Sequence, residues 1–131
     1  MGKLEELTRL GEARVYEKPK KYVSTTPIMD YNGRTYCVKD IIDTAQFWIG
    51  CLEKIDNRNE EKYKETELLL RGIILSLENQ YAEPPRKKQV EYMIDVLKEI
   101  RDKNARSEAE LQYNEQMAEI LKIFAKMCLR E

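Results

Sequence analysis

The chain has 131 residues, of which 42% are hydrophobic and 36% are charged, and its formal net charge at pH 7 is −1. This length is typical of one domain that buries its own core without a metal or disulfides. The small net charge predicts no general attraction to nucleic acid or anionic lipid, so such a contact would need a local patch. No apolar run approaches the roughly 18 residues of a membrane span, and residues 1–10 lack the apolar core of a signal peptide. We therefore expect a cytoplasmic protein with no membrane contact.

The sequence contains no histidine, which excludes Ser-His and Cys-His catalysis, His-ligated zinc and the Glu-x-x-His di-iron site of helical bundles. The three cysteines, Cys37, Cys51 and Cys128, are far apart and form no Cys-x-x-Cys pair. We interpret them as small buried hydrophobic residues, because an odd number of isolated cysteines argues against a disulfide framework. We predict no metal, no cofactor and no catalytic residue.

Residues 1–38 are predicted to form an arm built around a β-hairpin. Leucine recurs at every third position over residues 3–10, which favours a short helix that ends at Gly11. Residues 13–17 alternate apolar and polar side chains as a strand does, and Pro27 begins the next strand. The arm should therefore bring several strands together before the first long helix.

The pair Asn32-Gly33 is the clearest local signal, because both residues tolerate the positive φ angles of a type I′ hairpin turn. A two-residue loop pairs Tyr31 with Arg34, Asp30 with Thr35, Met29 with Tyr36 and Ile28 with Cys37. One hairpin face would then carry Tyr31, Arg34 and Tyr36 together with Met29. We regard those aromatic and cationic side chains as a candidate surface for a base, a sugar, an anion or a protein. The alternative is that they pack on the first helix.

Residues 39–83 are predicted to form a helical hairpin with a break at residues 57–59. Asp40 is a suitable N-cap, and the apolar arc of the helix that follows covers roughly 220° of its circumference, as expected of a central helix. Asn59 can cap the second helix, whose apolar stripe continues to Tyr81 before Pro84-Pro85 ends it. Gly72 inside this helix costs about 1 kcal/mol relative to alanine. It is either tolerated or marks the close approach of another backbone.

Residues 86–131 are predicted to begin with a third helix near Arg86. Apolar residues almost vanish over residues 101–110, where no glycine or proline interrupts the chain, so one long helix is favoured over a turn capped by Ser107 and Glu110. Beyond that stretch the apolar arc widens to roughly 240°, more than one neighbour can cover. We predict a homodimer through this helix, the alternative being an internal helix wrapped by the N-terminal arm. The predicted interface consists of Leu111, Met117, Leu121, Phe124 and Cys128.

Two further patterns offer alternatives to simple binding. The pairs Glu53-x-x-Asp56 and Glu99-x-x-Asp102 are similar to part of the Mg²⁺ site of all-α nucleotide pyrophosphohydrolases, but the Glu-x-x-Glu of that family is absent. The basic run Arg86-Lys87-Lys88 places positive charge at a helix N-terminus, against the helix dipole, which favours contact with an anion or with nucleic acid.

The string from Tyr31-Asn32-Gly33 to Val38-Lys39-Asp40-Ile41 is loosely similar to the opening of phage antirepressor N-terminal domains, without the Leu-Gly that closes that pattern. A β-hairpin arm before long dimerising helices also resembles small phage proteins that sequester signalling nucleotides of host defence. These resemblances imply a phage or mobile-element accessory protein of the anti-defence type.

We therefore expect a mainly α (α+β) fold, with a β-hairpin arm and a bundle of three to four long helices. The expected function is that of a non-enzymatic homodimer that sequesters a small anionic ligand, such as a signalling nucleotide, or blocks a host protein. A nucleic-acid-binding regulator and a Mg²⁺-dependent pyrophosphohydrolase are the alternatives.

Overall fold

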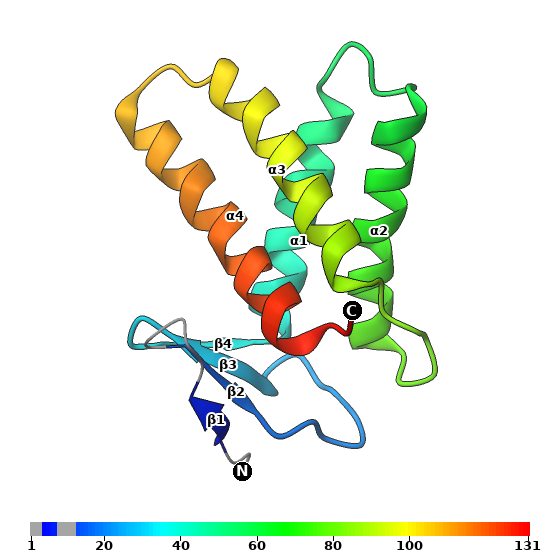
Figure 1. Ribbon diagram of the computed structural model, residues 1–131, viewed down its shortest axis with the longest axis vertical. Helices are drawn as coiled ribbons and strands as arrows, with labels where there is room; N and C mark the ends of the chain where they lie inside the picture. Colours follow the sequence, from blue (N-terminus) through cyan, green and yellow to red (C-terminus); the bar gives the residue numbers. More distant parts are fainter. Residues whose placement is uncertain (1–3, 8–12) are drawn as a thin grey trace.

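The computed structural model describes residues 4–7 and 13–131 of the chain, and in these residues a small antiparallel sheet precedes four helices (Figure 1). The strands lie in the order β1-β2-β3-β4. Their bounds are Leu4–Leu7 for β1, Arg14–Tyr16 for β2, Pro27–Tyr31 for β3 and Arg34–Cys37 for β4. The helices are α1, Val38–Glu53, α2, Glu61–Glu78, α3, Lys87–Lys103, and α4, Glu108–Cys128. The prediction of a mainly helical fold with a preceding β arm is confirmed.

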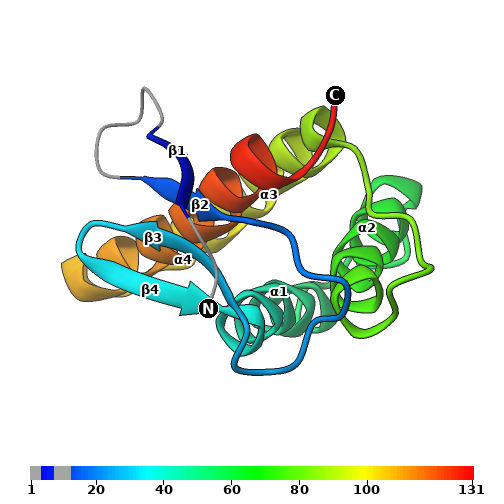
Figure 2. The same cartoon turned by 90° about the horizontal axis from the view of Figure 1, so that it is seen from below.

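The sheet lies across one end of the helices, next to the start of α1 and the end of α4 (Figures 1 and 2). Residues Leu4–Leu7 form strand β1 and not the expected helix, because they pair antiparallel with β2. A neighbouring strand supplies backbone hydrogen-bond partners that a single short helix in water largely lacks. Gly11, the expected end of that helix, lies outside the described residues.

The hairpin of β3 and β4 has the predicted turn, with φ of 51° at Asn32 and 77° at Gly33. Three of the four expected residue pairs are present, namely Tyr31 with Arg34, Asp30 with Thr35 and Met29 with Tyr36. The fourth is wrong, because an irregularity between Pro27 and Met29 places Cys37 opposite Pro27. One extra residue in β3 accounts for this shift, as in a β-bulge.

Helix α1 is the central element, since it contacts α2, α3, α4 and strand β4. Ile41, Ala45 and Trp48 on this helix are fully buried, which confirms the prediction made from its wide apolar arc. The helix begins earlier than expected, however, because Cys37 is its N-cap. Asp40 instead occupies the third helical position, where its carboxylate accepts a 2.9 Å hydrogen bond from the backbone N–H of Cys37.

Helix α2 ends at Glu78, well before the proline pair that was expected to end it. The side chain of Asn79 accepts a hydrogen bond of 2.9 Å from the backbone N–H of Tyr81, a local turn that competes with the next helical turn. Tyr81 therefore leaves the apolar stripe and is 87% exposed. The cap at the other end is Glu60, one residue after the expected Asn59.

A turn separates α3 from α4, so the preferred prediction of one long helix is wrong. Ser107 is the N-cap of α4, and its hydroxyl accepts a hydrogen bond of 3.1 Å from the backbone N–H of Glu110. The carboxylate of Glu110 in turn accepts one of 3.0 Å from the backbone N–H of Arg106. The first bond satisfies a backbone donor in the first turn of α4, and the second ties the residue before the cap to the helix.

Helix α4 packs against α3 and α1 and contributes to the common core of the single chain. Two of the residues expected at a dimer interface, Leu121 and Phe124, are buried there, because α4 meets neighbours on more than one side. Of the other three, Leu111 and Cys128 are exposed and Met117 is partly buried. Homodimerisation remains a prediction. Leu121 and Phe124 do not support it, because they are buried within one chain. None of the described helices is long and apolar enough to cross a membrane.

Candidate functional site

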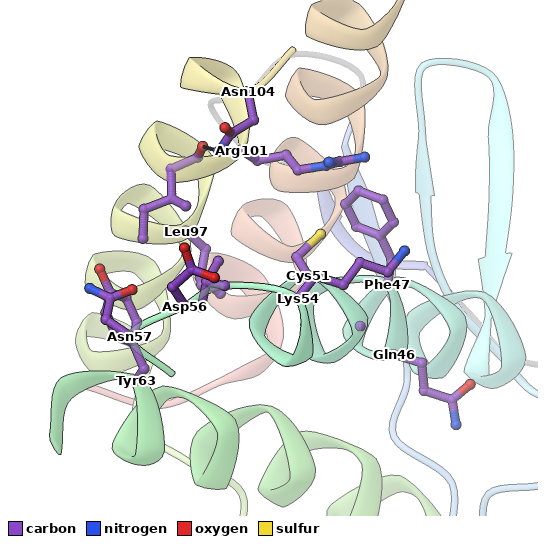
Figure 3. A pocket seen from close by; sticks show the side chains of 13 residues that line it. Gln46, Phe47, Cys51, Lys54, Asp56, Asn57, Tyr63, Leu97, Arg101 and Asn104 are labelled. Atoms are coloured by element: carbon purple, nitrogen blue, oxygen red, sulfur yellow. Dashed lines mark hydrogen bonds between the residues drawn. The ribbon is translucent and has the colours of Figure 1, made fainter. Parts of the chain in front are cut away.

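A cleft of about 580 Å³ lies between the second half of α1, the start of α2 and the second half of α3 (Figure 3). Its volume is in the range of roughly 300 to 1,000 Å³ that is usual for small-molecule sites. The loop between α1 and α2 contributes Asp56 and Asn57 to the rim. The cleft thus combines three helices, as ligand sites between the helices of a bundle do.

One side of the cleft is aromatic and aliphatic. Phe47 lines it from α1, and its ring is held edge-on by Trp48 at 4.9 Å and by Tyr113 at 5.3 Å between ring centroids. Tyr63 lines it from α2 and is almost fully buried. Ile55, Leu97 and Ile100 complete the apolar lining. Rings fixed in this way offer a ready surface for a planar ligand.

Arg101 provides the main charge of the cleft. Its side chain extends from α3 towards Phe47 and Cys51 (Figure 3). The Nε atom is buried and has no hydrogen-bond partner in the described part of the chain. The guanidinium group forms no ion pair with any residue that the structure describes. Because an unpartnered buried donor costs free energy, this arginine is poorly explained by folding alone.

Cys51 lies beside this cation, at the floor of the cleft. Burial raises the pKa of the Cys51 thiol, and the positive charges of Arg101 and Lys54 offset only part of that rise. The thiol is therefore protonated at neutral pH and is a poor nucleophile. Lys54 is exposed at the rim and adds a second positive charge to the cleft.

The amide groups of Gln46, Asn57 and Asn104 surround the opening, where they can donate and accept hydrogen bonds. Asn104 donates one amide hydrogen to the carbonyl oxygen of Ile100 at 2.8 Å, which fixes its side chain. The cleft therefore combines an apolar wall, two cations and a polar rim that includes the Asp56 carboxylate. That combination suits an organic anion with a ring.

The candidate surface on the hairpin is largely taken up by contacts within the chain. Tyr36 is 5% exposed and belongs to the core. Arg34 lies 4.7 Å above the Tyr36 ring and forms a 3.4 Å ion pair with Asp40. Tyr31 is partly buried against the same core. The Arg34 side chain stays exposed, and none of the three residues lines the cleft, so a ligand role for this hairpin face stays a prediction.

The basic run at the start of α3 binds the last residue of the chain. Arg86 donates a hydrogen bond of 2.6 Å to the backbone oxygen of Glu131. Lys87 and Lys88 form ion pairs of 2.8 and 3.8 Å with the Glu131 carboxylate. This run lies roughly 22 Å from Arg101 along α3, at 1.5 Å per residue. The two groups of cations are therefore separate.

The carboxylate pairs of the metal hypothesis do not gather into one site. Asp102 accepts hydrogen bonds of 2.8 Å from Lys98 and 3.1 Å from Asn114. Asp56 lines the cleft, whereas Glu53 lies on another groove of the protein. No cluster of three metal-ligating side chains occurs within the described ranges.

The prediction of site residues from the sequence missed Arg101. One sequence signal was available, because Arg101 continues the spacing of Val90, Ile94 and Leu97 on the buried stripe of α3. A cation at a stripe position is more informative than a run of cations at a helix end.

Comparison of the chain with protein-family models, curated proteins and solved structures finds no match. The side chains of the cleft are thus the basis for a functional proposal.

Proposed function

We propose that this protein is a non-enzymatic binding protein whose cleft holds a small organic anion of the nucleotide class. The observation that carries this proposal is the Arg101 guanidinium, which extends into the cleft without a carboxylate partner among the described residues. A phosphate or carboxylate group of a ligand would supply the anionic partner that the terminal nitrogens of this guanidinium lack among the described residues. Such charge-assisted bonds are among the strongest polar contacts a site can offer.

The apolar wall supports a ligand with an aromatic ring. A base stacked on Phe47 would lie within reach of the amides at the rim, while its phosphate groups would face Arg101 and Lys54. A signalling nucleotide has this combination of planar base and negative charge. Sequestration of such a nucleotide by an accessory protein of a phage or mobile element is the biological role we propose.

A binding role fits the residues of the cleft better than catalysis. The Cys51 thiol is kept protonated by burial, so it is not an activated nucleophile. Asp56 stands at an exposed rim position, where its carboxylate is in contact with solvent. Among the described residues, neither group has a hydrogen-bond partner that could act with it in general acid–base catalysis.

Isothermal titration calorimetry with nucleoside monophosphates, triphosphates and cyclic dinucleotides tests the proposal. We expect at least one of them to bind, and Arg101→Met to weaken that binding at least tenfold. Arg86→Met is the matched control, because it removes a guanidinium from the N-cap of the same helix, away from the cleft. Equal affinity of the two variants, or no binding by any of these nucleotides, would contradict the proposal.

A further inference from the structure

Gly50 lies inside α1 although its own surroundings do not require a glycine. A Cβ atom added at Gly50 would meet nothing within 4 Å, so packing within the described chain does not explain it. Gly72 in α2 is different, since a Cβ atom there would lie 3.2 Å from Cγ of Pro85. Glycine is unfavourable in a helix, and an open glycine on a helix surface permits the close approach of a partner.

A groove of about 600 Å³ runs between α1 and α2, and Gly50 is among the residues that line it. Each helix contributes lining residues at positions i, i+3, i+4 and i+7, two turns that face the same space. Ile49 and Ile74 lie at its apolar base, and Leu75 stands at its side with 51% of its surface exposed. One heptad earlier on α2, Leu68 is 70% exposed. A helix laid along such a groove would cover this apolar surface.

The charges around the groove indicate what kind of helix would fit. Glu53 and Glu78 line the groove, and neither forms an ion pair with any residue in the described ranges. The cation at the groove, Arg71, is already bound to Glu67 at 2.8 Å. A second copy of this face would bring the acidic side chains of both copies together. A basic partner would neutralise them.

We propose that this groove docks an amphipathic helix of a partner protein, with an apolar stripe flanked by lysine or arginine. The stripe would lie over Gly50, Ile74 and Leu75, and the flanking cations would pair with Glu53 and Glu78. This is the helix-in-groove mode of recognition, in which apolar anchors recur at i, i+3, i+4 and i+7. The groove shares Gln46 and Gly50 with the cleft, but Glu53, Leu75 and Glu78 line the groove alone. The docking proposal therefore does not depend on a ligand in the cleft.

The experiment uses a fluorescent peptide of about 18 residues, long enough to form a helix, with leucines at this spacing and lysines on both flanks. A second peptide carries glutamates in place of the lysines. Fluorescence anisotropy with the full chain should detect binding of the lysine peptide and not of the glutamate peptide. Leu75→Gln should weaken binding at least tenfold, whereas Leu111→Gln, which changes an exposed leucine of α4, should not.

A second pair of variants tests the contribution of the acidic side chains of the groove. Glu53→Gln with Glu78→Gln should weaken binding of the lysine peptide at least tenfold, whereas Glu17→Gln with Glu99→Gln, of equal net charge, should not. Equal affinity of all four variants and the wild type would overturn the proposal. So would a dimer in sedimentation that Leu75→Gln dissociates, because the groove would then serve a second copy. Nucleotide affinity measured on Leu75→Gln should be unchanged, which separates a failure of this proposal from a failure of the cleft.

Discussion

The side-chain amide of Asn114 donates a hydrogen bond of 3.1 Å to the carboxylate of Asp102, and this bond joins α4 to α3 close to the turn between them. Asn114 is fully buried. Lys98 completes the cluster with a 2.8 Å contact to Asp102 and another of 2.8 Å to Glu115. Polar groups in such a network fix one arrangement of two helices, because other arrangements leave them unpaired.

Replacement of Asn114 by alanine should therefore destabilise the protein. The change removes a donor to Asp102 and leaves a small cavity, so we expect a loss of about 1 to 3 kcal/mol in the free energy of unfolding. Urea denaturation followed by circular dichroism measures it. Gln112→Ala, at an exposed amide of the same helix, should change stability by less than about 0.5 kcal/mol. Equal effects of the two substitutions would show that the network contributes little.

Asp102 should also make stability depend on pH. Burial acts to raise the pKa of Asp102, but hydrogen bonds from Lys98 and Asn114 outweigh it and hold the pKa below the ordinary 3.8. Because the folded-state pKa is the lower one, the stabilisation is complete above pH 3.8 and is lost as the pH falls through the folded-state value. The difference in stability between wild type and Asp102→Asn should therefore be constant at neutral pH and shrink in acid. Denaturation at a series of pH values checks this, and a constant difference at every pH would contradict it.

Ser107 tests the turn between α3 and α4. Its hydroxyl caps α4, so Ser107→Ala should cost about 1 kcal/mol, whereas Ser107→Asp should keep the cap. In a continuous helix the outcome would be the opposite, because alanine is the better helix former. Chemical denaturation of the three proteins separates these cases. A stabilised Ser107→Ala variant would contradict the turn.

The same segment shows how far the sequence predicts this fold. The apolar stripe of α1 and the Asn32-Gly33 turn are local patterns, and both were predicted correctly. The turn at Ser107 was visible as an alternative, but its choice depends on the pairing of Asp102 with Asn114 across two helices. The spacing of apolar residues along one helix does not predict long-range contacts of this kind. The end of α2 has a local cause instead. The Asn79 side chain accepts a hydrogen bond from the backbone N–H of Tyr81, and this bond competes with a further helical turn.

The candidate site was predicted less well than the fold. The sequence predicts anion contact at the basic run, and in the structure Arg86 and Lys87 of this run contact Glu131. Arg101 is a single cation at a stripe position, and its significance depends on the cleft that three helices form around it. The sequence lists the residue types that can line a site, whereas the shape of the cleft is visible only in the structure.

The two helical glycines should respond differently to alanine. Gly50→Ala should stabilise the protein by about 0.5 to 1 kcal/mol, because the new methyl group meets no atom within 4 Å. Gly72→Ala should gain less or lose stability, since its methyl group would press on the Pro85 ring at 3.2 Å. Thermal and urea denaturation of both variants measure the difference. Equal gains would mean that the Pro85 ring moves aside at little cost.

The thiol of Cys51 reports on the charge of Arg101. The positive charge of Arg101 lowers the pKa of Cys51 against the larger effect of burial, so Arg101→Met should raise that pKa further. Alkylation by iodoacetamide requires the thiolate, and its rate profile should therefore move to higher pH in the variant. The measurement uses a chain in which Cys37 and Cys128 are replaced by serine, so that Cys51 alone reacts. Arg86→Met should leave the profile where it is, because that guanidinium lies at the opposite end of α3. If Arg101→Met leaves it unchanged as well, the guanidinium does not face the thiol and would not face a ligand in the cleft.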